Sequence, residues 1–226
     1  MNLTMNGSHL ELVPSVKLLG AEIDHDLSFT SHVDKICKKL SQRIGILKKI
    51  RSCLTMQHRL LYYNAMIKSV INYVSTVWTS CNKENLGKIL KMQKRAARVI
   101  CNAHGQASSV ELFNRLQWVP LYEGAKIAKC CLAYKRVKNN VPAYIEDSLK
   151  LNSDRHTRTT RYSNINFICP RYNRETEGAK TFAVTTCKLW NSLKLDLRNS
   201  VSLRSFKNNY WNSIFNEQKG LDHFIV

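Results

Sequence analysis

Glu22, Asp24 and Asp26 form the only dense group of carboxylates in the sequence. Three acids spaced two residues apart lie on one face of an extended segment, where carboxylate oxygens can hold a divalent metal ion. A metal-dependent nuclease is therefore one function open to this chain. A two-metal site draws its carboxylates from separate elements, and no other segment offers a matching partner. The alternative is that these acids end a strand and precede a helix, where negative charge is favourable.

Other signatures of catalysis are absent from the sequence. The seven histidines share no ligand spacing such as HExxH, and neither a GxSxG elbow nor a glycine-rich phosphate loop occurs. The eight cysteines show no CxxC spacing, so we expect small buried hydrophobic residues in a reducing compartment. The sequence therefore predicts no catalytic residue, no metal site and no cofactor.

Positive charge is the strongest feature of the composition. Lys and Arg number 35 against 16 Asp and Glu, which gives a formal net charge of +19. Basic chains of this size most often bind nucleic acid or an anionic membrane surface. The sequence contains neither an apolar run of signal-peptide length near its start nor 18 consecutive apolar residues. We therefore expect an intracellular protein, nuclear or cytoplasmic, whose partner is RNA or DNA rather than a membrane.

The charge is patterned along a predicted helix whose sequence from 88 to 100 is KILKMQKRAARVI. Apolar and small residues, with Gln93 among them, recur at helical spacing and form one stripe. The opposite face carries only cations, namely Lys88, Lys91, Lys94, Arg95 and Arg98. No acid occurs from 85 to 110, so the helix lacks the Glu–Lys pairs that usually stabilise a solvated face. We predict that this face contacts a nucleic-acid backbone.

Two further basic segments are candidate backbone contacts. A helix capped by Thr30 or Ser31 places a second set of cations beside its apolar stripe: Lys35, Lys38, Lys39 and Arg43. The segment 151–180 is rich in Arg, Ser, Thr and Asn and poor in helical period, so we expect an extended chain that follows phosphates. Its candidate contacts are Arg155, Arg158 and Arg161.

The pattern as a whole predicts a mainly α fold. We expect a short N-terminal β-hairpin with its turn at Pro14-Ser15, then a multi-helix bundle in which one helix from Thr55 to Trp78 is central, an extended Arg-rich segment and C-terminal amphipathic helices. The expected order is an unstructured terminus (1–8), the hairpin (9–29), a helical bundle (30–105), further helices (106–150), the extended segment (151–180), the C-terminal helices (181–215) and a tail (216–226).

Five stretches follow one another along the chain. They are VKLLGAEIDHDLSFTSHVDKI, LTMQHRLLYYNAMIKSVINYVSTVW, LGKILKMQKRAARVI, LQWVPLYEGAKIAKCCLAYKRVKNNVPAYI and LWNSLKLDLRNSVSLRSFKNNY. In order and spacing they resemble the carboxyl-terminal third of reverse transcriptases from LINE-type (non-LTR) retrotransposons of the jockey-like branch. The resemblance covers roughly residues 10–212.

The resemblance implies a role for each part. Residues 16–24 would correspond to the strand region that closes the palm, and 30–105 to the helical thumb that holds the template–primer duplex. The cationic face of the 88–100 helix would then meet the backbone of an RNA–DNA duplex. Residues after about 106 would match the family's post-thumb extension.

The chain also departs from that family. The family's Asp-Asp box and its partner Asp precede the region present here, and this sequence contains no adjacent Asp pair. We therefore expect a fragment or relic that does not polymerise on its own, with magnesium expected only in a full-length polymerase.

Two classes of function remain beside the nuclease. The leading hypothesis is a non-catalytic nucleic-acid-binding fragment whose contacts are directed to the backbone and largely independent of sequence. The competing hypothesis is a helical protein-interaction piece whose basic faces dock on missing upstream polymerase domains. It predicts exposed apolar surface on the hairpin, around Leu10 to Ile23. The sequence leaves the oligomeric state open.

Overall fold

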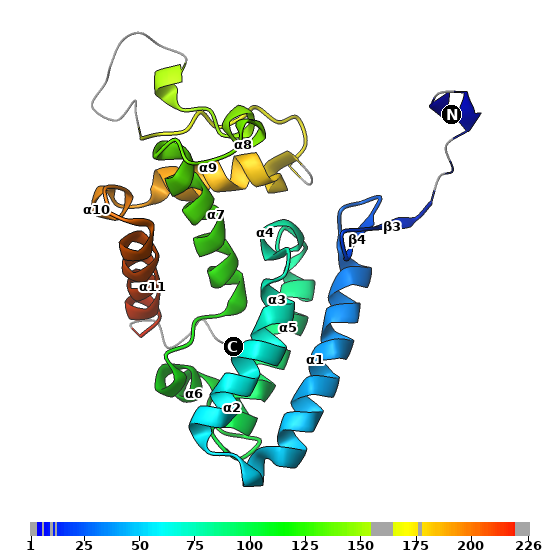
Figure 1. Ribbon diagram of the computed structural model, residues 1–226, viewed down its shortest axis with the longest axis vertical. Coiled ribbons are helices and arrows are strands. Elements are labelled where there is room, and N and C mark those ends of the chain that lie inside the picture. The colour runs from blue at the N-terminus through cyan, green and yellow to red at the C-terminus, as the bar shows by residue number, and fades with distance from the viewer. Residues whose placement is uncertain are drawn as a thin grey trace.

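The computed structural model of the chain describes residues 4–5, 7–9, 11, 13–154, 165–175 and 178–219. The fold is mainly α, with a short N-terminal hairpin followed by a multi-helix bundle, as the sequence predicts (Figure 1). Within the described residues, every helix is too short or too polar to span a lipid bilayer. Two hydrophobic cores organise the chain, one in each half.

The N-terminal part contains two small antiparallel pairs of strands. β1 (Thr4–Met5) pairs with β2 (Ser8–His9), mostly within the terminus 1–8 that was expected to be unstructured, and β3 (Ser15–Leu18) pairs with β4 (Ala21–Asp24). The predicted turn at Pro14-Ser15 is wrong. The hairpin turns at Leu19-Gly20, where both residues have positive φ angles of 47° and 84°. This two-residue turn matches the twist of the strands, and glycine adopts the required backbone conformation without strain.

The first core is built by helices from the first half of the chain. They are α1 (Thr30–Ile50), η1 (Arg51–Cys53), α2 (Met56–Tyr62), η2 (Tyr63–Lys68), α3 (Ser69–Asn72), α4 (Ser75–Trp78) and α5 (Lys83–Ile100). The predicted single helix from Thr55 to Trp78 is interrupted twice. η2 is a π-helix, and the chain breaks at Tyr73–Val74, where Val74 has a φ angle of 51°. This segment is not wholly buried, because Leu61, Tyr73 and Val77 are exposed.

The second core is built by helices from the other half. They are α7 (Leu121–Val137), α8 (Ala143–Ser148), α9 (Phe182–Ser192), α10 (Leu195–Arg198) and α11 (Leu203–Lys219), with short 3-10 turns η3 (Asn152–Asp154) and η4 (Gly178–Lys180). At its centre, Phe206 stacks on Tyr134 with ring centroids 5.2 Å apart, and Trp190 lies 5.6 Å from the same ring. Helices that the sequence assigned to separate segments therefore share one core (Figure 1). Between the two cores, α6 (Ser109–Leu116) packs Leu112 and Phe113 against Ala97 of α5 in a smaller third cluster.

The ends of the predicted segments differ slightly from the observed ones. Of the segment 151–180, the described residues include an isolated bridge between Leu151 and Phe167 besides the two short turns. The final helix runs to Lys219, past the predicted start of the tail at 216. Leu10 and Leu12, which fall within the predicted hairpin, lie outside the described residues.

Gln93 joins the two halves of the molecule. This side chain lies on the predicted apolar stripe of α5 and is only 2% exposed. Its Nε2 donates to the carbonyl oxygen of Val119 over 3.0 Å, and its Oε1 accepts from the backbone N–H of Leu121 over 3.2 Å. These two hydrogen bonds hold the 118–121 loop, where α6 gives way to α7, against the first core.

We predict that Gln93→Met lowers the free energy of unfolding by about 3 kcal/mol, because it leaves a buried carbonyl and a buried N–H without their partner. Urea denaturation measures the loss. Gln42→Met, at an exposed position of α1, serves as the matched control and should change stability by less than about 0.5 kcal/mol. Equal stability of the two variants would contradict this role for Gln93.

Candidate nucleic-acid interface

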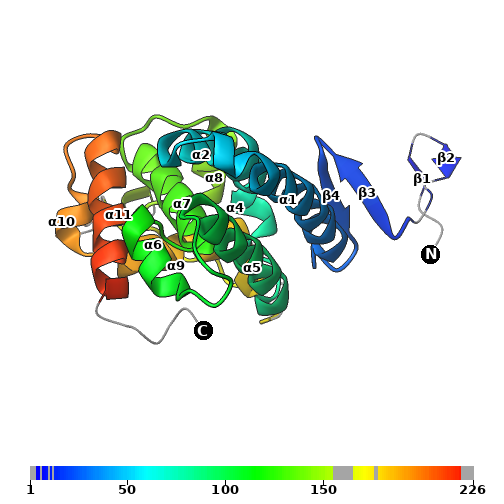
Figure 2. The ribbon, with the colours of Figure 1, turned by 90° about the horizontal axis from the view of Figure 1, so that it is seen from below.

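α1 and α5 lie side by side and run in the same direction (Figure 2). Two cross-helix contacts fix their register. Lys88 Nζ of α5 lies 2.9 Å from Asp34 Oδ1 of α1. About two turns further along both helices, Arg95 donates to Ser41 Oγ over 3.3 Å. The cationic face of α5 therefore continues onto the exposed face of α1. Leaving aside Lys35, which pairs with Glu22, and Lys83 at the start of α5, we call the other exposed cations of this pair the α1–α5 basic surface: Lys38, Lys39, Lys48, Lys49, Lys91 and Arg95.

Three of the five predicted cations of α5 are half-buried: Lys88, Lys94 and Arg98. Lys88 pairs with Asp34, and this hydrogen bond raises the pKa of Lys88. Arg98 is half-buried and donates to the carbonyl oxygen of Ala107 over 3.5 Å. Lys94 is also half-buried, and burial lowers its pKa, with the charge of Arg98 adding to the effect. Lys91 and Arg95 remain exposed.

The cations predicted on α1 divide in the same way. Lys35 forms an ion pair with Glu22 of β4, and the hydrogen bond from Lys35 lowers the pKa of that carboxyl group. The Arg43 guanidinium donates to the carbonyl oxygen of Met66 in η2. Lys38 and Lys39 are exposed to solvent. Tertiary partners, which sequence periodicity does not reveal, thus engage both Lys35, whose side chain stays exposed, and Arg43, which is half-buried.

A groove of about 530 Å³ borders the basic surface between β3, α1 and α3. Its lining includes Lys17, Lys39 and Tyr73, and its one carboxylate, Glu22, is paired with Lys35. His32 also lines it. Burial lowers the pKa of His32, so the ring is neutral near pH 7 and adds no charge. The groove extends the region of positive potential from the outer face of α1 toward the hairpin.

The structure adds cations that the sequence analysis did not select. Lys48 and Lys49 occupy the exposed last turn of α1, and Lys17 lies on β3. The acid-free run of basic residues toward the end of α1 was the signal for the first two. Arg155, Arg158 and Arg161, the predicted contacts of the extended segment, lie outside the described residues.

Glu22, Asp24 and Asp26 do not converge on one point. Glu22 bonds with Lys35 and with the Ser31 hydroxyl, and Asp26 lies 2.7 Å from the His25 ring. No group of three or more His, Cys, Asp or Glu side chains suited to a metal ion occurs in the described part of the chain. These carboxylates, held apart by separate partners, do not fit a two-metal site.

Asp24 instead stabilises the turn that leads into α1. Its carboxylate accepts hydrogen bonds from the backbone N–H groups of Ser28 over 2.6 Å and Phe29 over 3.2 Å. This confirms the interpretation of the acid as one that precedes a helix. The predicted cap at Thr30 or Ser31 is wrong, because Phe29 occupies the cap position without a side-chain hydrogen bond and Asp24 satisfies the N–H groups just before the helix.

Comparison with known proteins identifies no relative. No protein-family model matches the chain, and no curated protein or solved structure gives a significant match.

We predict that Asp24→Ala lowers the free energy of unfolding by about 1 kcal/mol at pH 7, as removal of a helix cap does. Burial opposes the charge of Asp24, but hydrogen bonds from Ser28, Phe29 and Thr30 outweigh it and hold its pKa below 3.8. A carboxylate whose pKa is lower in the folded state than in the unfolded state stabilises the fold at pH values above its unfolded-state pKa. This stabilisation is lost as the pH falls through its folded-state pKa. The difference in the free energy of unfolding between wild type and Asp24→Ala should therefore shrink below pH 3.8.

Urea denaturation at a series of pH values measures this difference. The matched control is Asp26→Ala, at an exposed carboxylate two residues away. A constant difference between wild type and Asp24→Ala across the acid range would show that the charge of Asp24 is not involved.

Proposed function

We propose that the chain binds the sugar–phosphate backbone of nucleic acid through the α1–α5 basic surface and catalyses no reaction on its own. The observation that carries this proposal is the parallel packing of two helices whose exposed faces are both cationic. Each helix contains a single acid, Asp34 in α1 and Glu84 in α5. Because the helices are parallel, both acids lie at the same end of the pair. The remaining length presents cations without a neighbouring carboxylate on either helix.

The chemistry of this surface suits phosphate rather than base edges. Its exposed side chains are five lysines and one arginine, and long flexible cations neutralise phosphates without reading sequence. Lys48 and Lys49 occupy the last turn of α1, where backbone dipoles disfavour anions, and the other four cations lie in the interior of their helices. Binding therefore depends on side-chain charge rather than on helix termini. We expect affinity that falls steeply with salt and varies little with sequence.

The proposed ligand is an RNA–DNA duplex. Support comes from the five ordered stretches that resemble a LINE-type reverse transcriptase and from a hairpin that leads directly into a helical bundle. Under this proposal, residues 30–105 act as a thumb-like element that grips the template–primer backbone. The carboxylates of the polymerase reaction are not part of the sequence, so gripping rather than synthesis is the activity proposed.

We predict that the triple variant Lys38→Glu, Lys91→Glu, Arg95→Glu binds a labelled RNA–DNA hybrid at least about tenfold more weakly than wild type near 0.1 M salt. The slope of log affinity against log salt should fall by about 3, because about one ion is released for each phosphate that a cation neutralises. Fluorescence anisotropy across a salt series measures both quantities.

The matched control reverses three exposed cations in the second half of the chain, as Lys150→Glu, Lys194→Glu, Arg204→Glu. It has the same net charge as the triple variant. Equal weakening by both variants would mean that net charge alone governs binding, and the α1–α5 basic surface would have no specific role.

A second candidate function, docking on a protein, has its own observation. All four residues of β3 are exposed, and the apolar side chains of Val16 and Leu18 are 53% and 57% exposed. In the described part of the chain, β3 pairs only with β4 and leaves its outer edge without a strand neighbour. An apolar edge of this kind can accept a strand from another protein. A domain with an acidic surface and an exposed strand could pair with this edge and form ion pairs with the cations beside it.

Docking through β3 predicts that the isolated chain self-associates at micromolar concentration, because its exposed edge pairs with a second copy. Sedimentation velocity over a concentration series measures this. Val16→Gln with Leu18→Gln, which leaves the charge unaltered, should restore the monomer and leave hybrid binding unchanged, whereas a wild-type chain that stays monomeric throughout would count against an adhesive edge.

A further inference from the structure

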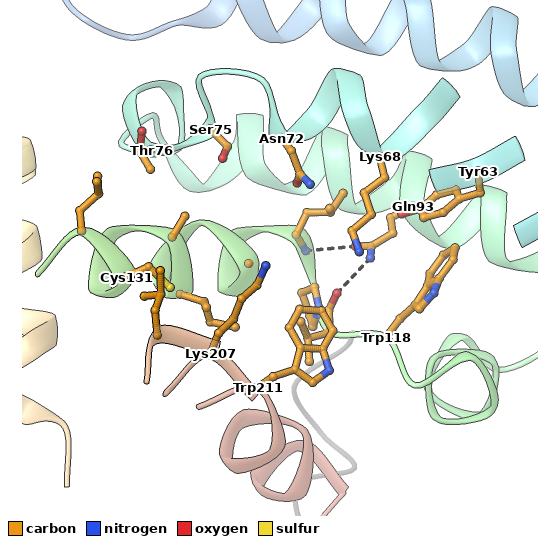
Figure 3. A pocket seen from close by; sticks show the side chains of 18 of the residues that line it. Tyr63, Lys68, Asn72, Ser75, Thr76, Gln93, Trp118, Cys131, Lys207 and Trp211 are labelled. Atoms are coloured by element: carbon orange, nitrogen blue, oxygen red, sulfur yellow. Dashed lines mark hydrogen bonds between the residues drawn. The ribbon is translucent and has the colours of Figure 1, made fainter. Parts of the chain in front are cut away.

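A second pocket, of about 490 Å³, lies between η2–α3, α7 and α11 (Figure 3). None of its lining residues belongs to the α1–α5 basic surface, so it is a separate feature of the molecule. Its volume falls within the range of small-molecule sites, which are concave, mostly apolar and furnished with a few convergent polar groups.

Aromatic rings form part of its wall. Trp118 stacks on Tyr63 with ring centroids 4.1 Å apart and an interplanar angle of 24°. The hydrogen bonds of Gln93 to the 118–121 loop hold the backbone beside Trp118 in place. Trp211 of α11 supplies a second indole at the same pocket, as Figure 3 shows. A flat apolar ring could pack against these surfaces with a gain proportional to the area that it buries.

The π-helical segment directs a charge into the same space. Residues five apart share a face in a π-helix, whereas in an α-helix they point in different directions. η2 begins at Tyr63 and ends at Lys68, so both side chains reach the pocket. The Lys68 ammonium lies 5.8 Å from the centroid of the Trp211 ring.

Three lysines from three elements surround this space: Lys68, Lys135 and Lys207. No acid occurs among the described residues that line the pocket. Figure 3 shows Lys68 and Lys207 reaching toward each other from facing helices. Burial lowers the pKa of Lys68, and the charge of Lys207 lowers it further. Cations gathered in this way gain from an anion placed between them.

We propose that this pocket binds a small aromatic molecule that carries a phosphate or carboxylate group. The ring packs against Trp118 and Trp211, and the anion lies between Lys68 and Lys207. Asn72, Ser75 and Thr76 line another side of the pocket and offer hydrogen-bonding groups to polar substituents on the ring (Figure 3). This inference does not depend on the proposed binding of nucleic acid.

Isothermal titration calorimetry of the full chain tests the proposal, with 1-naphthyl phosphate and 1-naphthoate as aromatic anions. 1-Naphthol carries the ring without the charge, and inorganic phosphate carries the charge without the ring. We expect at least one aromatic anion to bind about tenfold more tightly than either partial probe, because charge-assisted hydrogen bonds and ring burial act together. Equal affinity for all four probes, or no binding, would overturn the proposal.

Substitutions locate the binding. Lys207→Gln, at an exposed position, and Lys68→Met should each weaken binding of the aromatic anion about fivefold or more, and Trp211→Leu should weaken it for every probe that has a ring. Lys150→Gln and the triple variant of the α1–α5 basic surface should bind as wild type does. Thermal unfolding verifies that each variant is folded. Binding that survives Lys207→Gln and Trp211→Leu unchanged would place the ligand elsewhere and contradict the proposal.

Discussion

The parallel packing of α1 on α5 forms the centre of the first core and sets two rows of cations side by side. Both helices bury apolar residues in one core, among them Leu40 and Ile44 of α1 and Ile89 and Ala96 of α5. Burial of each large side chain contributes about 1.5–3 kcal/mol, whereas an exposed ion pair contributes at most about 1 kcal/mol. Apolar packing therefore outweighs the repulsion between two neighbouring rows of cations. The protein keeps this repulsion on its surface, and phosphate binding would relieve it.

The pair of hydrogen bonds from Gln93 constrains the junction between the two cores. A polar residue on an apolar stripe is costly unless both its donor and its acceptor are satisfied, and here the 118–121 loop satisfies both. This fixes the point at which the chain leaves the first core and enters α7. It also places Trp118 against Tyr63 and so shapes the pocket that the π-helical segment lines. The proposed small-molecule site is therefore a consequence of how the two cores are joined.

Sequence periodicity predicted the hairpin, the helices of both halves and the cationic faces, because those features depend on residue spacing within one element. Periodicity failed to predict the partner of a side chain where that partner belongs to another element. Lys88 meets Asp34, Arg43 meets Met66, and Asp24 rather than Thr30 satisfies the N–H groups before α1. The π-helix and the break at Val74 lie in an apolar run whose spacing gives no sign of either. The exposed cations Lys38, Lys39, Lys91 and Arg95 were thus predictable from the sequence, whereas the partners of Lys35, Lys88 and Arg43 depend on packing between elements.

Contact between phosphate and the α1–α5 basic surface can be measured by residue-resolved lysine acetylation. The chain is acetylated with and without an RNA–DNA hybrid duplex, and the modified lysines are quantified by mass spectrometry. We predict that the duplex protects Lys38, Lys39 and Lys91, while Lys150 and Lys194, which are also exposed, react at unchanged rates. Uniform protection of all five lysines, or protection confined to Lys150 and Lys194, would contradict this contact.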